Sequence, residues 1–418
     1  MREMKDSGIE WIGAIPTTWH TKKMKYISNF IQNKYSSDYG LLPYIGLENI
    51  ASWSGSFIST NSQYDREQSL ICEPEDILFG KLRPYLAKVY MNDRLCCCSN
   101  EFAVIRVNGQ NKRYMWYQLL SHGFIFEIDR STYGTKMPRA NAEFIRNVFV
   151  ALPSEIEQQK IANYLDKMCA EIDAVLEKTR ASIEEYKKLK QSVITQAVTK
   201  GVRGDRPMKD SGIEWIGEIP AEWNKDKVIR VFSVIGSGTT PKSSDENLFD
   251  GNTPWIQSGD INGENLFVTK NCVSNSAIES YSALRVYQAP YLVVAMYGAS
   301  VGNLSLSMID ACVNQACCVL KKPTINLKFS FYIFKAVKDY LAQKAVGGGQ
   351  PNISQETIKQ LWLPIPSADE QIEISNYLDE KCRSVDALIA KKQQYFTEIE
   401  TYKKSLIYEY VTGKKEVV

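Results

Sequence analysis

Histidine is nearly absent from this sequence: His20 and His122 are the only two in 418 residues, and they lie far apart. A zinc site or a catalytic triad that depends on histidine is therefore poorly supported. The ten cysteines include no C-x-x-C pair, and five of them stand in two uninterrupted groups, at 96–98 and at 317–318. Such groups favour buried thiols on strands in a reducing compartment.

Long apolar runs are missing as well. No stretch reaches the roughly 18 apolar residues of a membrane-spanning helix. The first six residues lead into no apolar segment of the kind found in signal peptides, so we expect a cytoplasmic protein. Apolar residues make up 44% and charged residues 23%, which is typical of globular proteins, and the length suggests two or three domains.

Motifs of DNA-modifying enzymes are missing too. The sequence has no Pro-Pro dipeptide, and therefore no Asn/Asp-Pro-Pro-Tyr motif with which a methyltransferase holds a flipped base. It has no G-x-x-x-x-G-K-[ST] loop of an ATP-driven motor, and the motif at 236–238 (Gly-Ser-Gly) is more typical of a tight turn. The Glu-x-Lys pairs at Glu3 and Glu185 do not suggest a metal-dependent nuclease site, because they lie at the terminus and in an expected helix rather than at strand ends. We expect no catalytic activity and no cofactor.

The chain is a tandem repeat. Residues 4–13 recur without change as residues 208–217, at an offset of 204, and the match continues into the residues that follow. Four tryptophans of this repeated motif are expected to seat each domain on the helices rather than to stack on bases: Trp11, Trp19, Trp215 and Trp223.

A second repeated block closes each half. Residues 153–199 match residues 366–412 at an offset of 213, so the second half holds nine extra residues between its blocks. The segments in between, 20–150 and 224–364, share no close register. If a simple domain duplication had diverged by random mutation, all segments would have diverged. Here the repeated blocks are kept, whereas the segments between them differ. This arrangement indicates two domains that recognise two different things.

The closing blocks are predicted to be long helices. A Ser-x-x-Glu capping box begins each one, at 154–157 and 367–370, and Gly201 and Gly413 follow the last helical positions. Apolar residues recur at helical spacing in between, so the helices pack most simply as an antiparallel pair. The 28 residues at 172–199 would span about 42 Å, roughly a turn of B-DNA. A helical pair of this kind is more often only a scaffold. Its place between two variable domains favours a ruler, that is, a rigid spacer that sets the distance between the domains.

The variable blocks predict a mixed α/β (α+β) fold. Residues 76–79, 101–106 and 291–295 are predicted strands, and residues 115–120 and 331–338 are predicted helices. The expected division is a first recognition domain at 1–152, a helical spacer at 153–203, a second recognition domain at 204–365 and a second spacer at 366–418.

The order of these motifs resembles that of the specificity (S) subunits of Type I restriction–modification systems, over essentially the whole chain. The resemblance is carried by the repeated opening at 8–19 and by 43–50 (PYIGLENI), 76–84 (DILFGKLRP), 238–241 (GTTP), 254–261 (PWIQSGDI), 297–302 (YGASVG) and 314–316 (NQA). Each motif alone is weak, but their order, repeated twice at matching spacing, is highly specific.

The resemblance implies a non-catalytic subunit of a larger complex. Each recognition domain would read one part of a split target in double-stranded DNA through the major groove. The helices would hold the domains at a fixed separation and dock two modification (methyltransferase) subunits. Those subunits transfer a methyl group from S-adenosylmethionine to adenine, and a motor–nuclease subunit joins them for cleavage.

Candidate DNA contacts lie in polar loops, within segments of mild positive charge. Lysine and arginine exceed aspartate and glutamate by four in 20–150 and by three in 224–365. The candidates of the first domain are Lys81, Arg83, Tyr85, Tyr133, Lys136, Arg139 and Asn141. Those of the second domain are Lys242, Gln257, Asp260, Tyr297, Asn314, Gln315, Gln350 and Asn352.

Side-chain chemistry divides these candidates. An arginine can bond guanine N7 and O6, whereas a lysine more often meets a phosphate. The triple glycine at 347–349 would let the backbone approach a phosphate, and Gln350 or Asn352 could read adenine. The alternative for each loop is a solvated turn or a flexible linker.

Two other functions stay open at this stage. One is a stand-alone methyltransferase or nuclease, which a methyl-transfer assay without a partner would reveal. The other is an adaptor that makes no DNA contact, which sequence-dependent binding at varied salt would reject.

Overall fold

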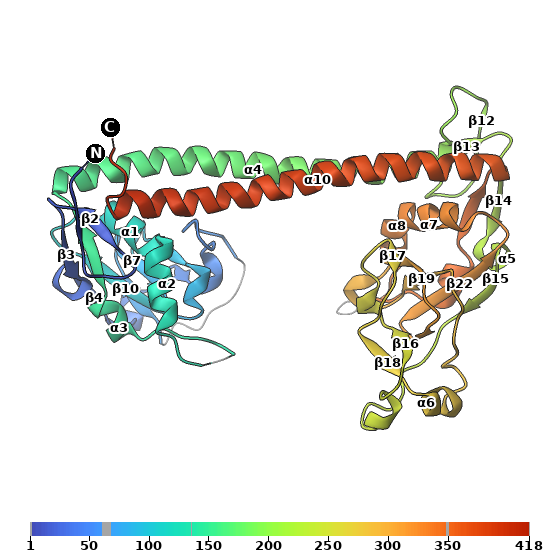
Figure 1. The fold of residues 1–418 in the computed structure, drawn as a ribbon, viewed down its shortest axis with the longest axis horizontal. Helices are drawn as coiled ribbons and strands as arrows, with labels where there is room; N and C mark the ends of the chain where they lie inside the picture. Colours follow the sequence, from blue (N-terminus) through green and yellow to red (C-terminus); the bar gives the residue numbers. More distant parts are fainter. Residues whose placement is uncertain (1, 61–67, 135, 348–350, 418) are drawn as a thin grey trace. The chain divides into compact units, whose positions relative to one another are not determined.

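The computed structural model describes residues 2–60, 68–134, 136–347 and 351–417. The chain divides into two compact units: unit 1 comprises Met1–Arg180 with Gln393–Val418, and unit 2 comprises Ala181–Lys392. Both division points fall inside long helices, α4 (Glu155–Lys200) and α10 (Ala368–Val411), so each unit contains part of each helix (Figure 1).

The two long helices begin and end where the sequence predicts. The backbone N–H of Glu157 donates to Ser154 Oγ over 3.4 Å, and Glu370 N–H donates to Ser367 Oγ over the same distance. Gly201 and Gly413 follow the helices with φ of 77° and 73°, a left-handed conformation that favours glycine. The serine caps and glycine stops are confirmed, but the second half of each capping box is not formed among the described residues, because the carboxylates of Glu157 and Glu370 accept from tryptophan side chains instead.

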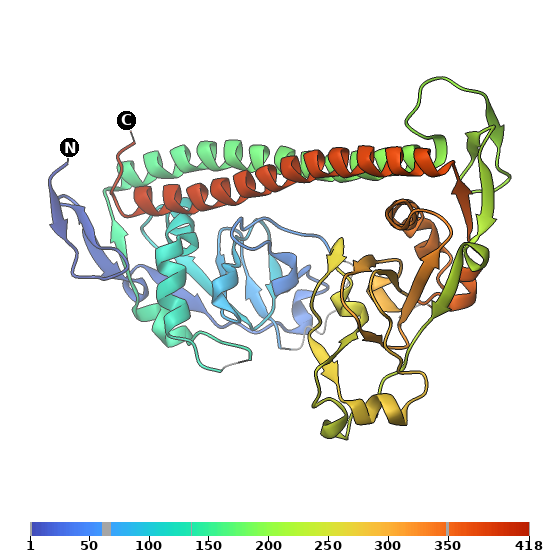
Figure 2. The ribbon, with the colours of Figure 1, turned by 45° about the vertical axis from the view of Figure 1, so that its right-hand side comes forward.

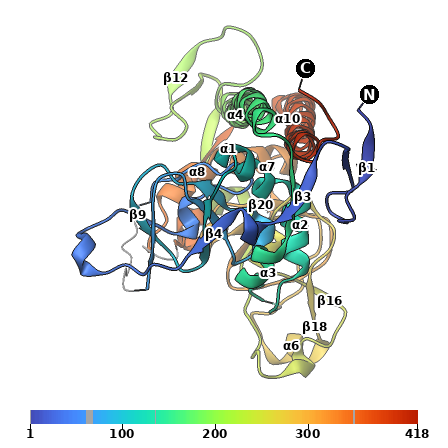
Figure 3. The same cartoon turned by 90° about the vertical axis from the view of Figure 1, so that its left-hand side faces the viewer.

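In each unit the two helices are antiparallel. The helices lie side by side (Figures 2 and 3), and successively later residues of α4 contact successively earlier residues of α10. The contacts in unit 1 are Tyr164 with Tyr410, Asp173 with Lys403 and Arg180 with Phe396. Those in unit 2 are Tyr186 with Lys392 and Lys190 with Asp386. No helix among the described residues is long and apolar enough to cross a membrane.

Unit 1 has a mixed fold, and its described strands form two larger sheets and two two-stranded sheets. Its strands are β1 (Met4–Asp6), β2 (Ala14–Pro16), β3 (His20–Lys23), β4 (Ser28–Ile31), β5 (Tyr44–Ile45), β6 (Leu70–Cys72), β7 (Ile77–Gly80), β8 (Val89–Met91), β9 (Cys96–Cys98), β10 (Phe102–Val107) and β11 (Phe149–Leu152). Its short helices are η1 (Met24–Tyr26), η2 (Ser37–Tyr39), η3 (Leu47–Asn49), η4 (Pro84–Leu86), α1 (Lys112–Leu120), α2 (His122–Arg130) and α3 (Ala142–Asn147). One larger sheet is antiparallel in the order β4-β10-β7-β8, and the other has the order β5-β9-β6 with β5 parallel to β9.

Unit 2 repeats this plan. Its strands are β12 (Met208–Asp210), β13 (Glu218–Pro220), β14 (Asn224–Lys227), β15 (Phe232–Gly236), β16 (Thr253–Ile256), β17 (Asn265–Leu266), β18 (Asn271–Val273), β19 (Tyr291–Ala295), β20 (Leu304–Ser307), β21 (Cys312–Val313), β22 (Cys317–Pro323) and β23 (Trp362–Ile365). Its short helices are α5 (Val228–Val231), η5 (Glu246–Leu248), η6 (Ser258–Asp260), α6 (Asn275–Ser280), η7 (Gly298–Ser300), α7 (Leu327–Ala336), α8 (Lys338–Gln343) and α9 (Gln355–Lys359). The two larger sheets have the orders β15-β22-β19-β20-β17 and β18-β16-β21, and the pairs β12-β13 and β14-β23 form two-stranded sheets.

The predicted elements of the variable blocks are confirmed, with one difference. The expected strands appear as β7, β10 and β19, and the first expected helix appears as α1. The second expected helix is interrupted at Val337, where α7 ends and α8 begins. Val337 is fully buried, so the apolar pattern continues through the break and hides it in the sequence.

Equivalent tryptophans pack each domain onto a long helix. Trp19 is 1% exposed and donates from Nε1 to Glu157 on α4 over 3.0 Å. Trp223 is equally buried and donates to Glu370 on α10 over 2.9 Å. Trp11 is buried in the same core as Trp19, and the prediction that these side chains pack rather than stack on bases is confirmed for these three.

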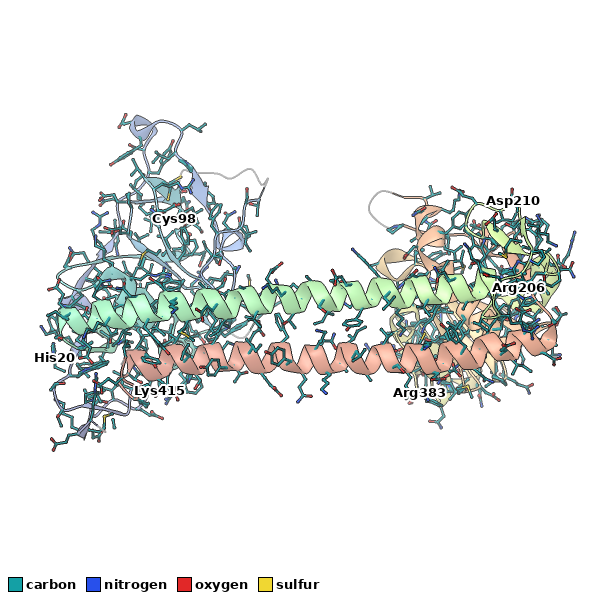
Figure 4. All side chains as sticks on the ribbon, turned by 90° about the horizontal axis from the view of Figure 1, so that it is seen from above. His20, Cys98, Arg206, Asp210, Arg383 and Lys415 are labelled. Carbon is teal, nitrogen blue, oxygen red and sulfur yellow. The ribbon has the colours of Figure 1, made fainter. Side chains whose placement is uncertain are left out.

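The cysteine groups lie on buried strands, as predicted. Cys96–Cys98 form β9, and Cys98 is labelled in Figure 4, to one side of α4 within unit 1. Two further cysteines contradict the expectation of strand positions, because Cys169 and Cys382 lie on α4 and α10. Both are buried where the helices pack against their domains, and burial raises the pKa of the Cys169 thiol to about 11.

Candidate nucleic-acid interface

In unit 1 the two predicted loops meet. Lys81 begins the loop after β7, and Pro138 belongs to the loop between α2 and α3. Arg83 N–H donates to Pro138 O over 2.7 Å, and Ala140 N–H donates to Lys81 O over 2.9 Å. An isolated antiparallel bridge joins Leu82 to the residue after Pro138. Segments about 50 residues apart in the chain are thereby joined into one surface.

Arg83 has an unusual backbone. Its φ of 50° lies in the left-handed region, which costs roughly 1–3 kcal/mol for a residue other than glycine. The bond from Arg83 N–H to Pro138 O holds this conformation, and Leu86 N–H also donates to Arg83 O over 2.9 Å. Its Nε is buried without a hydrogen-bond partner among the described residues. The loop geometry therefore fixes the direction in which the Arg83 side chain leaves the backbone.

The other candidates of unit 1 differ in their exposure. Tyr85 and Tyr133 are 45% and 61% exposed, and Lys136 is also exposed. Lys81 is partly buried, and burial lowers the pKa of its ammonium group. Asn141 caps α3, because its Oδ1 accepts a hydrogen bond of 2.8 Å from the backbone of the second residue that follows. Its side chain is thus already engaged in the fold.

The sequence did not single out Glu101, which forms an ion pair with Arg139. Glu101 precedes β10, and its backbone oxygen accepts a hydrogen bond of 2.8 Å from Lys81 N–H. The ion pair joins loops that are far apart in the chain, and no local motif marks its carboxylate partner. Nothing short of the sheet topology would have identified Glu101.

In unit 2 the corresponding loops meet in the same way. Gly298 N–H donates to Pro351 O over 2.8 Å, and Tyr297 bridges Asn352. Tyr297 is 43% exposed and Asn352 is also exposed. The structure therefore brings Tyr297 and Asn352 together. Gln350 lies outside the described residues.

Two candidates of unit 2 are buried parts of turns, and their side-chain oxygens accept hydrogen bonds within the fold. Asp260 is 8% exposed, and its carboxylate accepts a hydrogen bond of 2.9 Å from Gln257 N–H. Asn314 is also 8% exposed, and its Oδ1 accepts from Ala316 N–H over 3.0 Å. A side-chain oxygen used in this way stabilises the turn.

The remaining candidates of unit 2 lie at the surface. Gln315 is exposed, and its Oε1 accepts a hydrogen bond of 2.6 Å from the hydroxyl of Thr240. Gln257 is partly buried, and its Oε1 accepts from Asn271 Nδ2 over 2.8 Å. Lys242 is exposed, and its described hydrogen bonds involve its backbone alone: its N–H donates to a tyrosine hydroxyl, and its carbonyl accepts from Asp245 N–H. The hydrogen bond from Met296 N–H to Ala316 O places Gln315 beside the Tyr297 loop.

The Gly-Ser-Gly motif packs closely against its neighbour. A Cβ at Gly238 would overlap the backbone carbonyl of Val313, and Gly238 N–H donates to Asn314 O over 3.3 Å. The glycine is therefore required by close backbone packing, which agrees with the tight-turn interpretation.

Comparison with known proteins identifies the family. The model of the Type I restriction modification DNA specificity domain matches residues 16–185 and 220–398, which is more than half of the chain. The chain is 24% identical over 330 residues to the type I restriction enzyme MjaVIII specificity subunit of Methanocaldococcus jannaschii, covering 75% of this chain and 73% of that protein. It is 20% identical to the EcoBI specificity subunit of Escherichia coli, covering 93% and 84%.

A solved structure shows the same fold. It was described as the structural basis of complex assembly and conformational transition of the type I R-M system, and it matches with a TM-score of 0.76 at 17% identity. The match covers 96% of this chain and 99% of that one. The chain therefore belongs to the Type I restriction–modification DNA specificity family, and it carries two copies of the family domain.

Proposed function

We propose that this chain is the DNA-recognition subunit of a Type I restriction–modification complex, in which each recognition domain reads one half of a split target. The observation that carries the proposal is the repeated loop pair. Arg83 N–H to Pro138 O in unit 1 has its counterpart in Gly298 N–H to Pro351 O in unit 2. The same backbone scaffold presents different polar side chains in the two units, as expected for two readers of different sequences.

We further propose that the chain does not catalyse and holds no cofactor. The sequence lacks a base-holding Pro-Pro motif and an ATP-binding loop, so methyl transfer and translocation need other subunits. Two modification subunits would transfer methyl groups from S-adenosylmethionine to adenine, and motor–nuclease subunits would cleave DNA. Such a complex would work in the cytoplasm, where it meets DNA.

The long helices are proposed to set the spacing between the half-sites and to dock the modification subunits. The helices have 46 and 44 residues, and an α-helix of that length extends roughly 65–70 Å. We retain 1–152, 153–203, 204–365 and 366–418 as the functional division of the chain. The helical spacers at 153–203 and 366–418 then join the two recognition domains.

Methyl transfer to DNA with and without a purified modification subunit tests this function. We expect incorporation only when both proteins are present, and only into DNA that contains the split target. Incorporation by the chain alone would favour a stand-alone enzyme. An assembled complex whose DNA binding is insensitive to sequence at every salt concentration would favour the adaptor.

A further inference from the structure

One position of the loop pair is structurally equivalent in the two units. In unit 1, Tyr133 and Arg139 exchange two backbone hydrogen bonds, of 3.3 and 3.1 Å. In unit 2, Val346 and Asn352 exchange the same two bonds, of 2.9 and 3.0 Å. Arg139 and Asn352 each follow the proline whose carbonyl accepts from the partner loop. Arg139 therefore occupies the place in unit 1 that Asn352 occupies in unit 2.

The neighbouring position differs in charge. Lys81 N–H donates to Glu101 O over 2.8 Å, and Met296 N–H donates to Ala316 O over 2.8 Å, so Glu101 corresponds to Ala316. Arg139 therefore has the carboxylate of Glu101 beside it, whereas the residue that corresponds to Glu101 in unit 2, Ala316, offers only a methyl group.

The ion pair leaves most of the guanidinium available. Arg139 is 46% exposed in its side chain, and Glu101 is 24% exposed. Among the described residues, the bond to Glu101 uses one nitrogen of the guanidinium, Nη2. The other N–H groups remain for a ligand, because arginine has five donors. The negative charge of Glu101 beside the guanidinium also repels a phosphate, which favours a base edge as the partner of Arg139.

We propose that Arg139 and Asn352 are equivalent specificity-determining residues, and that Arg139 reads a guanine in one half-site while Asn352 reads an adenine in the other. Arginine matches guanine O6 and N7, and asparagine matches adenine N6 and N7. Glu101 is a positioning residue that holds Arg139 in direction. Asparagine needs no such partner, and Ala316 stands at that place. The inference rests on the proposed function and names the bases that it involves.

Methylation mapping of the assembled complex tests the assignment. In R139N/E101A, which copies the pair of unit 2, one guanine of one half-site should be replaced by adenine or lose its selection. The other half-site should stay unchanged. R139K keeps the positive charge but loses the planar guanidinium that can bond O6 and N7 together. Discrimination at that guanine should therefore fall roughly 5- to 150-fold. R139K keeps the assignment testable if the double variant does not assemble.

A matched control is R94N/D93A. Arg94 and Asp93 form an exposed ion pair of 2.7 Å before β9, at the opposite end of that strand from Glu101. The control should methylate the wild-type sequence. The role of Glu101 is tested by E101Q, in which total DNA affinity should hold or rise while discrimination at the guanine falls.

The two possible failures are distinguishable. If wild-type complex shows no sequence-dependent methylation, the proposed function is wrong. If the wild type is specific and both assembled Arg139 variants methylate the same sequence as before, Arg139 is only a surface ion pair and the assignment is wrong. A wild-type target without a G·C base pair in the half-site that unit 1 reads would overturn it as well.

Discussion

Lys403 on α10 places its ammonium group 2.6 Å from Asp173 on α4, and its side chain is only 9% exposed. At an offset of 213, the same pair recurs in unit 2 with the helices exchanged, as Lys190 and Asp386 at 2.6 Å. Each unit thus fixes the register of its own part of the helix pair with one charged contact. Asp173 and Asp386 are about half exposed, so water reaches one side of each pair.

Removal of the buried lysine is expected to destabilise unit 1. In K403M the carboxylate of Asp173 loses its charged partner, and the free energy of unfolding should fall by about 1–2 kcal/mol. K187A is the matched control, because Lys187 pairs with Glu184 on the exposed face of the same helix pair. It should change stability by less than about 0.5 kcal/mol. Denaturant unfolding of both variants measures the difference, and equal effects would contradict it.

A second buried ion pair should matter more. Arg206 lies 2.6 Å from Glu370, whose side chain is only 2% exposed, and Figure 4 labels Arg206 near the end of α4. R206A would leave a buried carboxylate with only Trp223 as its described donor, which costs about 3 kcal/mol. R203A removes the exposed pair with Glu373 and should cost little.

The neutral variant E370Q in the R206A background separates charge from shape. Because glutamine removes the buried charge, it should recover part of the lost thermal stability. If R206A and R203A unfold at the same temperature, Glu370 does not depend on Arg206.

Exchange of residues 20–150 for the same segment of another family member should change one half-site only. The ends of this insert are paired with each other, since β3 and β11 are antiparallel neighbours, so the insert leaves and returns at one place. Methylation mapping of the chimera measures both half-sites. Loss or alteration of both in an assembled complex would show that the domains are not separate readers.

Lengthening the helix pair where the two units divide should lengthen the spacer between the half-sites. An insertion near Gly201 falls inside unit 2, where α4 ends, and would not lengthen the helices between the units. Four residues inserted after both Arg180 and Lys392 would add about 6 Å, close to two base pairs. The mapped spacer should lengthen while the bases of each half-site stay the same. An active complex with an unchanged spacer would refute the ruler.

Local signals predicted much of this fold. The serine caps and glycines set the ends of α4 and α10, and short apolar runs marked β7 and β19. The division of the chain within the helices left no such signal, because helical periodicity runs through Arg180 and Gln393 without interruption. Helix formation depends on nearby residues, whereas division into units depends on contacts between distant segments.

The site was harder to predict for the same reason. The motifs marked loops that the structure brings together, but the partner of Arg139 is a glutamate that only the sheet brings near. Asp260 and Asn314 looked like contact residues because polar side chains in turns are usually exposed. Tertiary packing buries both of them, and their oxygens bond to backbone N–H groups. Burial of a turn is set by what packs over it, which sequence spacing does not record.

We expect this chain to determine which DNA sequence is methylated. The most direct measurement maps methylated adenines in cells that hold the modification subunits, with this gene present and with it deleted. A split sequence, two specific parts separated by a fixed spacer, should be methylated only when the gene is present. The same methylated sequence in both strains would contradict it.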